Sequence, residues 1–305
     1  MADQPVRSAR LKIWGVRGSI PVPGPSTLRY GGNTSCVEVR ADDEIIVLDA
    51  GTGIRELGLA LQQEFQSKPI RVTLLITHVH WDHIHGFPFF APSYDKKNEI
   101  RILGYDGAGT GPVEALKGEM ATPFFPVSLT DLPGKLEIEK LATNSFKVGK
   151  VRIESKLMNH PGTCVGYRIF SNGGSMAYIP DNESYEVKVH SLAPGSSDPA
   201  EARQQAEKER GELVKFLQGA NVLLLDAQYT DEEYRAHIGW GHGSLSSAVL
   251  LALDAKVRKL VLFHHDPNHD DSEIDTMLAQ AKQLAAKHGG NLEIEAAREG
   301  AEFTW

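Results

Sequence analysis

Four metal-ligand side chains directly after one apolar run constrain this chain more than any other feature. The run at residues 72–76 is short, apolar and β-branched, which predicts a buried strand. Three histidines and an aspartate then fall within six positions: His78, His80, Asp82 and His83. Imidazole and carboxylate are ligands of divalent metals, and four donors in one segment favour two adjacent ions over one tetrahedral site with an open position. His78 and His80 would face one ion, and the other two donors would face the second. The alternative is a polar turn in which His83 only caps a helix.

Composition sets limits on what surrounds this segment. The 305 residues are enough for one large domain or two small ones, and 41% hydrophobic with 24% charged residues is ordinary for a globular protein. Cys36 and Cys164 are the only cysteines, so a disulfide framework is excluded and both are expected to be small buried residues. No apolar run could span a bilayer and no signal-peptide core is present, so we expect a cytoplasmic protein with no membrane partner.

Periodicity predicts strands and helices in both halves of the chain, an α/β or α+β pattern. We expect a polar tail at 1–10 and a single domain at 11–305, in which the Gly- and Pro-rich segment 104–135 forms a lid. The alternative for that segment is a surface excursion packed by its own aromatic side chains. An exposed insertion is expected around 186–212. Strands are predicted at 11–16, 36–40, 45–49, 99–103, 136–141, 146–158, 164–171, 175–179, 221–226 and 260–263, and helices at 54–65, 244–255 and 272–288.

Three further metal-ligand side chains follow predicted strands. His160 comes after the strand that ends near 158, Asp181 follows 175–179, and His264 follows 260–263. Strand ends are where side chains from distant segments assemble a site, so we expect all three near the first four donors. His265, the next residue, remains a second choice for His264.

The segment Thr-His-Val-His-Trp-Asp-His at 77–83 resembles the signature of the metallo-β-lactamase fold superfamily. The segment Gly-His-Gly-Ser at 241–244 resembles one found in its phosphodiesterase-like branch, which includes tRNA 3′-processing nucleases and cyclic-nucleotide phosphodiesterases. The resemblance implies an α+β (α/β) fold, a four-layer αββα sandwich in which each half of the chain supplies one sheet faced by helices.

The resemblance also implies a role for each candidate residue. Asp181 would bridge the two ions, and Asp49 would support the site from behind its ligands. His242 would protonate the leaving oxygen with Asp226 holding its imidazole, and Asp82 is implied as a third catalytic residue. The implied ligands are His78, His80 and His160 for metal one, Asp82, His83 and His264 for metal two, and Asp181 for both.

Two positions separate this chain from other branches of the superfamily. A histidine stands at position 80, where oxygen-reducing diiron relatives carry a glutamate, which argues against an oxidoreductase. An aspartate stands at position 181, where many β-lactamases have a cysteine ligand nearby. The resemblance therefore favours phosphodiester chemistry.

We accordingly expect a dinuclear-metal-dependent hydrolase, a phosphodiesterase that acts through a metal-bridging hydroxide, with zinc as the metal and manganese or iron as alternatives. The net charge of −8 and the lack of a basic arm predict a small nucleotide-type phosphodiester as substrate, with no broad nucleic-acid surface. A homo-oligomer stays open. The alternatives are a carboxylic ester, lactone or thioester hydrolase on the same site, and a non-catalytic metal-binding or sensory module. The second is weakened because structural zinc sites are closed and four-coordinate.

Overall fold

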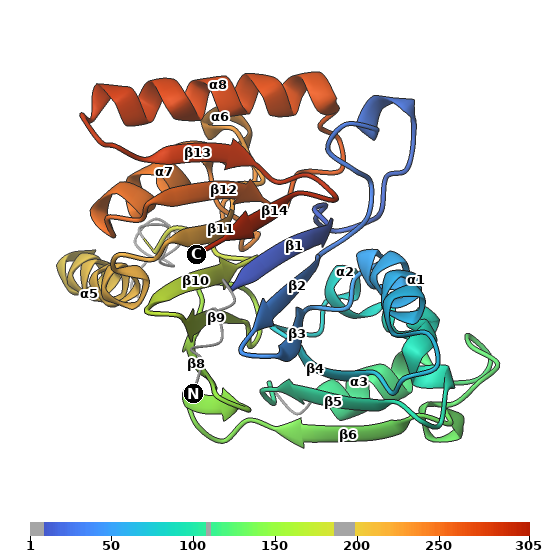
Figure 1. Ribbon diagram of the computed structural model, residues 1–305. Coiled ribbons are helices and arrows are strands. Elements are labelled where there is room, and N and C mark those ends of the chain that lie inside the picture. The colour runs from blue at the N-terminus through green and yellow to red at the C-terminus, as the bar shows by residue number, and fades with distance from the viewer. Residues whose placement is uncertain (1–8, 108–110, 186–198) are drawn as a thin grey trace, which may run out of the picture.

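Two seven-stranded mixed sheets lie face to face in the computed structural model, which describes residues 9–107, 111–185 and 199–305 (Figure 1). The first sheet has the order β14 (Glu302–Thr304), β1 (Arg10–Gly15), β2 (Cys36–Ala41), β3 (Glu44–Leu48), β4 (Arg71–Leu75), β5 (Glu99–Gly104) and β6 (Lys135–Lys140). The second has the order β13 (Glu293–Ala296), β12 (Lys259–Phe263), β11 (Val222–Asp226), β10 (Gly174–Ile179), β9 (Val165–Ser171), β8 (Val151–Leu157) and β7 (Ser145–Val148).

Helices cover the outer face of each sheet, so the molecule has four layers (Figure 1). On the first sheet these are α1 (Gly53–Phe65), α2 (Trp81–Ile84) and α3 (Pro112–Glu119), with the 3₁₀ turns η2 (Phe87–Phe89), η3 (Ala91–Tyr94) and η4 (Leu129–Asp131). On the second they are α5 (Pro199–Leu217), α7 (Leu245–Asp254) and α8 (Asp271–Lys287), with the short α6 (Asp231–Tyr234). A further 3₁₀ turn, η1 (Pro25–Thr27), lies in the loop between β1 and β2.

Strands that are apolar on both faces explain this layering. In β11, Val222 and Leu224 face the core between the sheets, whereas Leu223 and Leu225 face α5, α7 and α8. Successive side chains of a strand point to opposite faces, so a strand that is apolar throughout must be covered on both sides. The predicted αββα sandwich is therefore confirmed.

Most predicted elements match, and the differences have local causes. Residues 146–158 were predicted as one strand but form the hairpin β7–β8, which turns at Gly149 with a φ of +54° that favours glycine. The short strands β13 and β14 were missed. β14 pairs with β1, so the end of the chain completes the sheet that its beginning started (Figure 1).

The segment predicted as a lid contains α3, and the buried side chains of Leu116 and Met120 hold it to the first sheet. Residues 1–8, 108–110 and 186–198 lie outside the described residues, and they include most of the predicted tail and the first part of the predicted insertion. The rest of that insertion lies in α5, where Ala206 packs against the second sheet's outer core. No helix in the described ranges is long and apolar enough to cross a membrane.

Candidate metal centre

The loops that follow β4, β8, β10 and β12 bring the predicted ligands together. After β4 the chain turns at Thr77, whose backbone N–H and hydroxyl both donate to Asp49, and α2 then begins at Trp81. This turn presents four ligand side chains from one segment. The loops after the other three strands present one each: His160, Asp181 and His264.

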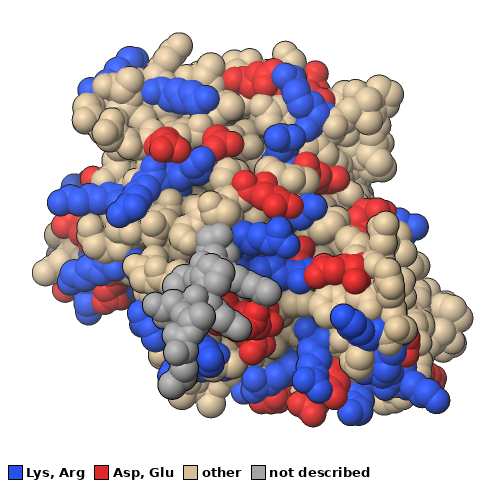
Figure 2. All heavy atoms as spheres, in the orientation of Figure 1, with Lys and Arg blue, Asp and Glu red and all other residues tan. Residues whose placement is uncertain are grey.

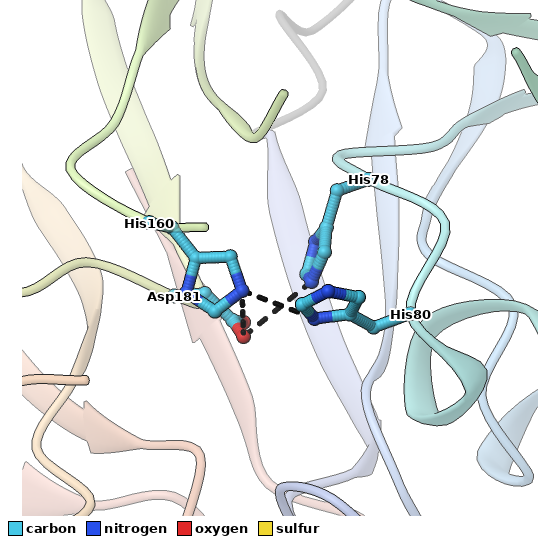
Figure 3. Close-up of side chains that lie close together, drawn as sticks. All are labelled: His78, His80, His160 and Asp181. Atoms are coloured by element: carbon cyan, nitrogen blue, oxygen red, sulfur yellow. Dashed lines mark hydrogen bonds and ion pairs between the residues drawn. The ribbon is translucent and has the colours of Figure 1, made fainter. Parts of the chain in front are cut away.

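The first cluster consists of His78, His80, His160 and Asp181, whose ligand atoms lie within 4.8 Å of one another (Figure 3). Oδ2 of Asp181 is 3.5 Å from Nε2 of His78 and 3.7 Å from Nε2 of His160. Nε2 of His160 is also 3.0 Å from Nδ1 of His80. Imidazole nitrogens of three histidines and one carboxylate oxygen of Asp181 thus lie close enough together to bind one ion.

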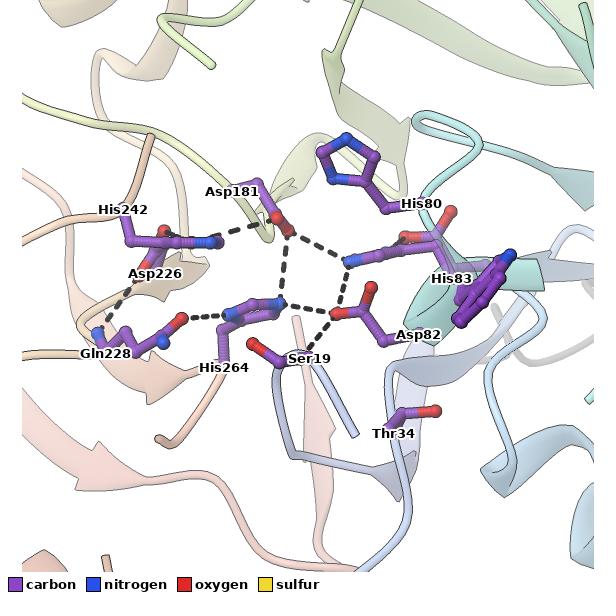
Figure 4. Close-up of polar contacts among 12 residues, drawn as sticks. Ser19, Thr34, His80, Asp82, His83, Asp181, Asp226, Gln228, His242 and His264 are labelled. Carbon is purple, nitrogen blue, oxygen red and sulfur yellow. Dashed lines mark hydrogen bonds and ion pairs between the residues drawn. The ribbon is translucent and has the colours of Figure 1, made fainter. Parts of the chain in front are cut away.

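The second cluster consists of Asp82, His83 and His264 and shares Asp181 with the first (Figure 4). Nε2 of His83 is 3.2 Å from Oδ2 of Asp82 and 3.1 Å from Oδ1 of Asp181. Nε2 of His264 is 3.1 Å and 3.4 Å from the same two oxygens. The two oxygens of Asp181 therefore face different clusters, as a bridging carboxylate would require.

Acceptors behind three of the candidate ligand imidazoles orient them. His83 donates from Nδ1 to Asp49 at 2.8 Å, His160 to the Gly241 carbonyl at 2.8 Å and His264 to the Gln228 side-chain oxygen at 3.0 Å. A proton fixed on Nδ1 leaves Nε2 without one, which is the state that binds a metal.

Unsatisfied buried atoms test whether metal ions fit this arrangement. Nε2 of His78, Nε2 of His83 and Oδ1 of Asp181 are buried and have no hydrogen-bond partner among the described residues. A buried polar atom without a partner is energetically unfavourable. Cations bound at the two clusters would provide a partner for each of these three atoms. The residues therefore fit divalent metal ions.

The two clusters differ in their electrostatics. Burial lowers the pKa of His78 well below its usual value, and the neighbouring His83 lowers it further. Burial alone would also lower the pKa of His83, but Asp82, Asp181 and Asp49 raise it well above its usual value. Burial would raise the pKa of Asp181, but His264, His83 and His78 lower it. The second cluster is thus the more anionic one.

His242 and Asp226 form a dyad beside the clusters. His242 donates from Nδ1 to Oδ2 of Asp226 at 3.0 Å, and its ring stacks on His264 at 4.8 Å (Figure 4). Asp226 is buried and also accepts the backbone N–H groups of Asn182 and Gln228. Burial lowers the pKa of His242, but Asp226, Asp181 and Asp82 together outweigh it and raise the pKa to about 9.

A cleft of about 420 Å³ opens onto both clusters and the dyad. It gives the candidate site access to solvent and room for a ligand. Its lining consists of Ser19, Val79, His80, Trp81, Asp82, Asp181 and His242.

All of the predicted site residues meet here, and His264 rather than His265 belongs to the cluster. His265 is buried and donates from Nε2 to the Ala297 carbonyl. Asp49 lies behind His83, as expected.

Sequence reasoning missed three supporting residues. Ser19 donates its backbone N–H to Asp82 at 2.8 Å, and Gln228 holds His264. Glu183 accepts the N–H groups of Gly239 and Gly241 and so holds the loop that carries His242. One signal in the sequence was available for two of them: Glu183 lies two residues after Asp181, and Gln228 lies two residues after Asp226.

Comparisons with known proteins agree with the fold. The family model of the metallo-β-lactamase superfamily matches residues 29–143. Ribonuclease Z of Thermoplasma acidophilum is 24% identical over 87% of this chain and 89% of its own, and that of Pyrococcus horikoshii is 23% identical over 79% and 83%. Unliganded yeast PDE1 superposes with a TM-score of 0.67 at 15% identity, covering 98% of this chain and 99% of its own.

These relatives contradict the prediction of a small-molecule phosphodiester substrate and no broad nucleic-acid surface. That prediction was wrong. Both sequence relatives are ribonucleases by name, and each matches this chain over most of its length. Net charge misled because it averages the whole surface, whereas bound cations would control the field in the cleft. On the face drawn in Figure 2, lysines and arginines are interspersed with acidic side chains.

The fold and the matched family model agree with each other. The arrangement implies divalent metal ions held by histidine and aspartate side chains. The chain has the metallo-β-lactamase fold, resembles the metallo-β-lactamase superfamily over residues 29–143, and is a metal-dependent hydrolase.

Proposed function

We propose that this protein is a dinuclear-metal phosphodiesterase that hydrolyses phosphodiester bonds in RNA. The observation that carries the proposal is the His242–Asp226 dyad at 3.0 Å, next to two clusters that share Asp181. Acyl hydrolysis at two metal ions has no evident use for a second, separate imidazole and carboxylate. A phosphodiester has a poor alkoxide leaving group and does need a proton donor. The similarity to ribonucleases supports RNA as the substrate class.

In this proposal each cluster holds one ion. Zinc suits the excess of imidazole ligands, although imidazole and carboxylate also accept manganese and iron. The ions would supply Lewis-acid charge that activates water and stabilises the negative charge that develops on the phosphate. The residues that would hold the ions are His78, His80 and His160 in the first cluster, Asp82, His83 and His264 in the second, and Asp181 in both.

The chain's own groups orient the substrate and move a proton. The oxygen of water forms a bond to phosphorus, and the bond from phosphorus to the leaving oxygen breaks. His242, which lines the cleft, gives its Nε2 proton to that leaving oxygen, while Asp226 holds Nδ1 and stabilises the charged ring. The proton released by the attacking water restores His242. The products are a phosphomonoester and an alcohol, so atoms and charges balance.

A substrate panel tests the proposal. Purified protein of known metal content is assayed with an RNA hairpin bearing a single-stranded 3′ extension, the DNA counterpart, a lactone and a thioester. We expect cleavage of the RNA, loss of activity with a chelator and about two metal ions per chain. Turnover of the lactone or thioester without cleavage of RNA would replace this proposal with an ester hydrolase. A non-catalytic module would turn over none of them.

A further inference from the structure

Two tryptophans near the candidate site expose their indoles to solvent. Trp81 is 77% exposed and Trp240 is 62% exposed. Tryptophan is a large side chain that is highly buried on average, so two exposed indoles near one cleft need an explanation. The other two tryptophans, Trp14 and Trp305, are partly buried against the sheets' cores.

Trp81 is fixed to the centre by its neighbours in sequence. It lies between His80 and Asp82, one from each cluster, and it lines the cleft. It is the first residue of α2, where the backbone N–H of His83 bonds to the carbonyl of His80. The backbone of Trp81 is therefore positioned by the neighbouring candidate ligands His80 and Asp82, while its indole projects into solvent.

Trp240 is fixed to the dyad by a series of aromatic contacts. Its ring meets the edge of His237 at 4.8 Å, and His237 stacks on Tyr229 at 4.4 Å with an interplanar angle of 14°. Tyr229 is in turn 6.2 Å from His242, measured between ring centroids. Glu183 accepts the N–H groups of the glycines on either side of Trp240, which limits the freedom of this loop. An exposed indole supported in this way is preorganised for a flat partner.

We infer that Trp81 and Trp240 stack unpaired nucleobases of a single-stranded RNA segment on the two sides of the scissile phosphate. The inference rests on the proposed phosphodiesterase function and names how that site holds its substrate. Trp240 would take the base on the leaving-oxygen side, because it lies two residues from His242. Trp81 would take the base on the other side.

The chemistry of the surface favours this occupant. Every base has a π face, so aromatic side chains bind single strands without reading sequence. Stacking requires no net positive charge, which allows a chain with a net charge of −8 to bind RNA close to its metal centre. The phosphate would meet the clusters and the bases would meet the indoles.

The test pairs each indole with the base that it would contact. A short single-stranded oligoribonucleotide is compared with versions made abasic on either side of the cleaved bond, using Trp81→Ala, Trp240→Ala and the corresponding Phe variants. Each Ala variant should raise KM for the intact oligonucleotide about tenfold with kcat and metal content unchanged, and Phe should restore most of the loss. On the abasic substrate that lacks the base facing the replaced indole, the Ala variant and the wild type should have the same KM. Leu59→Ala, which removes an exposed apolar side chain of α1, is the matched control and should change nothing.

Two outcomes overturn the inference while the proposed function stands. One is cleavage of the intact oligonucleotide by both Ala variants with wild-type KM, and the other is an equal effect on intact and abasic substrates. Binding is measured separately, by quenching of tryptophan fluorescence with a phosphorothioate oligoribonucleotide. Quenching should persist in Trp14→Phe and be lost when both exposed indoles are replaced. A wild-type enzyme that cleaves no RNA refutes the proposed function, and absence of quenching then refutes this inference as well.

Discussion

The two halves of the molecule contribute to the metal centre in different ways. The first sheet supplies four candidate ligands from a single turn after β4, between residues 78 and 83. The second sheet supplies His160, Asp181 and His264 from three separate strand ends that span about a hundred residues. The same half also supplies the dyad of His242 and Asp226. The candidate ligands of the first half are thus neighbours in the sequence. Those of the second half are distant in the sequence and are brought together by the order of the strands in the sheet.

The support behind the ligands differs as well. In the first half, a buried carboxylate, Asp49, accepts the proton of His83. In the second half the acceptors are neutral oxygens, the Gly241 carbonyl behind His160 and the Gln228 side chain behind His264. A carboxylate raises the basicity of an imidazole more than a neutral acceptor does. The difference predicts that the acceptor behind His83 contributes more to metal affinity than those behind His160 and His264, whereas the proton donor belongs to the second half alone.

The largest expected effect comes from Asp181, the residue of the second half that joins the two clusters. Asp181→Ala should remove both ions and lower turnover by about 10⁴-fold or more, because its two oxygens face different clusters. His160→Ala is the matched control and should weaken only the first ion. Elemental analysis after gel filtration gives the counts. Two retained ions in Asp181→Ala would show that the two clusters bind metal independently of this carboxylate.

The next effect separates metal binding from proton donation. His242→Ala should reduce hydrolysis of an RNA substrate ~10²–10⁴-fold and should spare a p-nitrophenyl diester, whose leaving group needs no proton. Asp226→Asn should show the same bias more weakly. Both variants should keep their metal, because neither residue is assigned as a ligand. If His242→Ala loses metal, His242 is a ligand. If both substrates slow equally, His242 binds phosphate without donating a proton.

A smaller effect is expected for the supporting carboxylate. Asp49→Asn should weaken the second ion by about 10–100-fold, since the acceptor behind His83 loses its charge. Gln228→Leu, which removes the neutral acceptor behind His264, should cost less. Competition with a chromophoric chelator measures both affinities. The opposite order would contradict the comparison between the halves, and a melting curve identifies any loss that comes from unfolding.

The smallest effect concerns the stability of the first half alone. Burial raises the pKa of Glu119, in α3, to about 7, and its Oε2 has no hydrogen-bond partner among the described residues. A carboxyl whose folded pKa is raised favours its protonated form, so stability falls as pH rises from about 4.5 to above 7. Glu119→Gln should therefore gain about 1 kcal/mol over the wild type at pH 8, after allowance for solvent screening, and nothing at pH 4. Thermal melting at both pH values measures this, with Glu207→Gln on the exposed side of α5 as control. An equal gain at both pH values would mean that burial of this charge is not the cause.

The same contrast explains what the sequence could predict. The ligands of the first half were found because they are contiguous, and His160, Asp181 and His264 because each ends an apolar strand. Periodicity predicted α1, α7 and α8 within one or two residues. The strands β13 and β14 are too short for a periodic signal and depend on partners elsewhere in the sheets. Ser19, Gln228 and Glu183 could not be found, because an ordinary serine, amide or carboxylate gains its role only from the tertiary fold.

The hydrogen bond from His160 to the Gly241 carbonyl has a consequence for cooperativity. It connects a candidate ligand of the first ion with the residue that directly precedes His242 and follows Trp240. An ion that holds His160 in place would also order the 239–242 loop, and a strand of RNA resting on that loop would tighten the ion by the same factor. Metal and substrate are therefore expected to be reciprocal effectors of one another. Hydrogen exchange at Gly239 and Gly241 should slow when either of them is added.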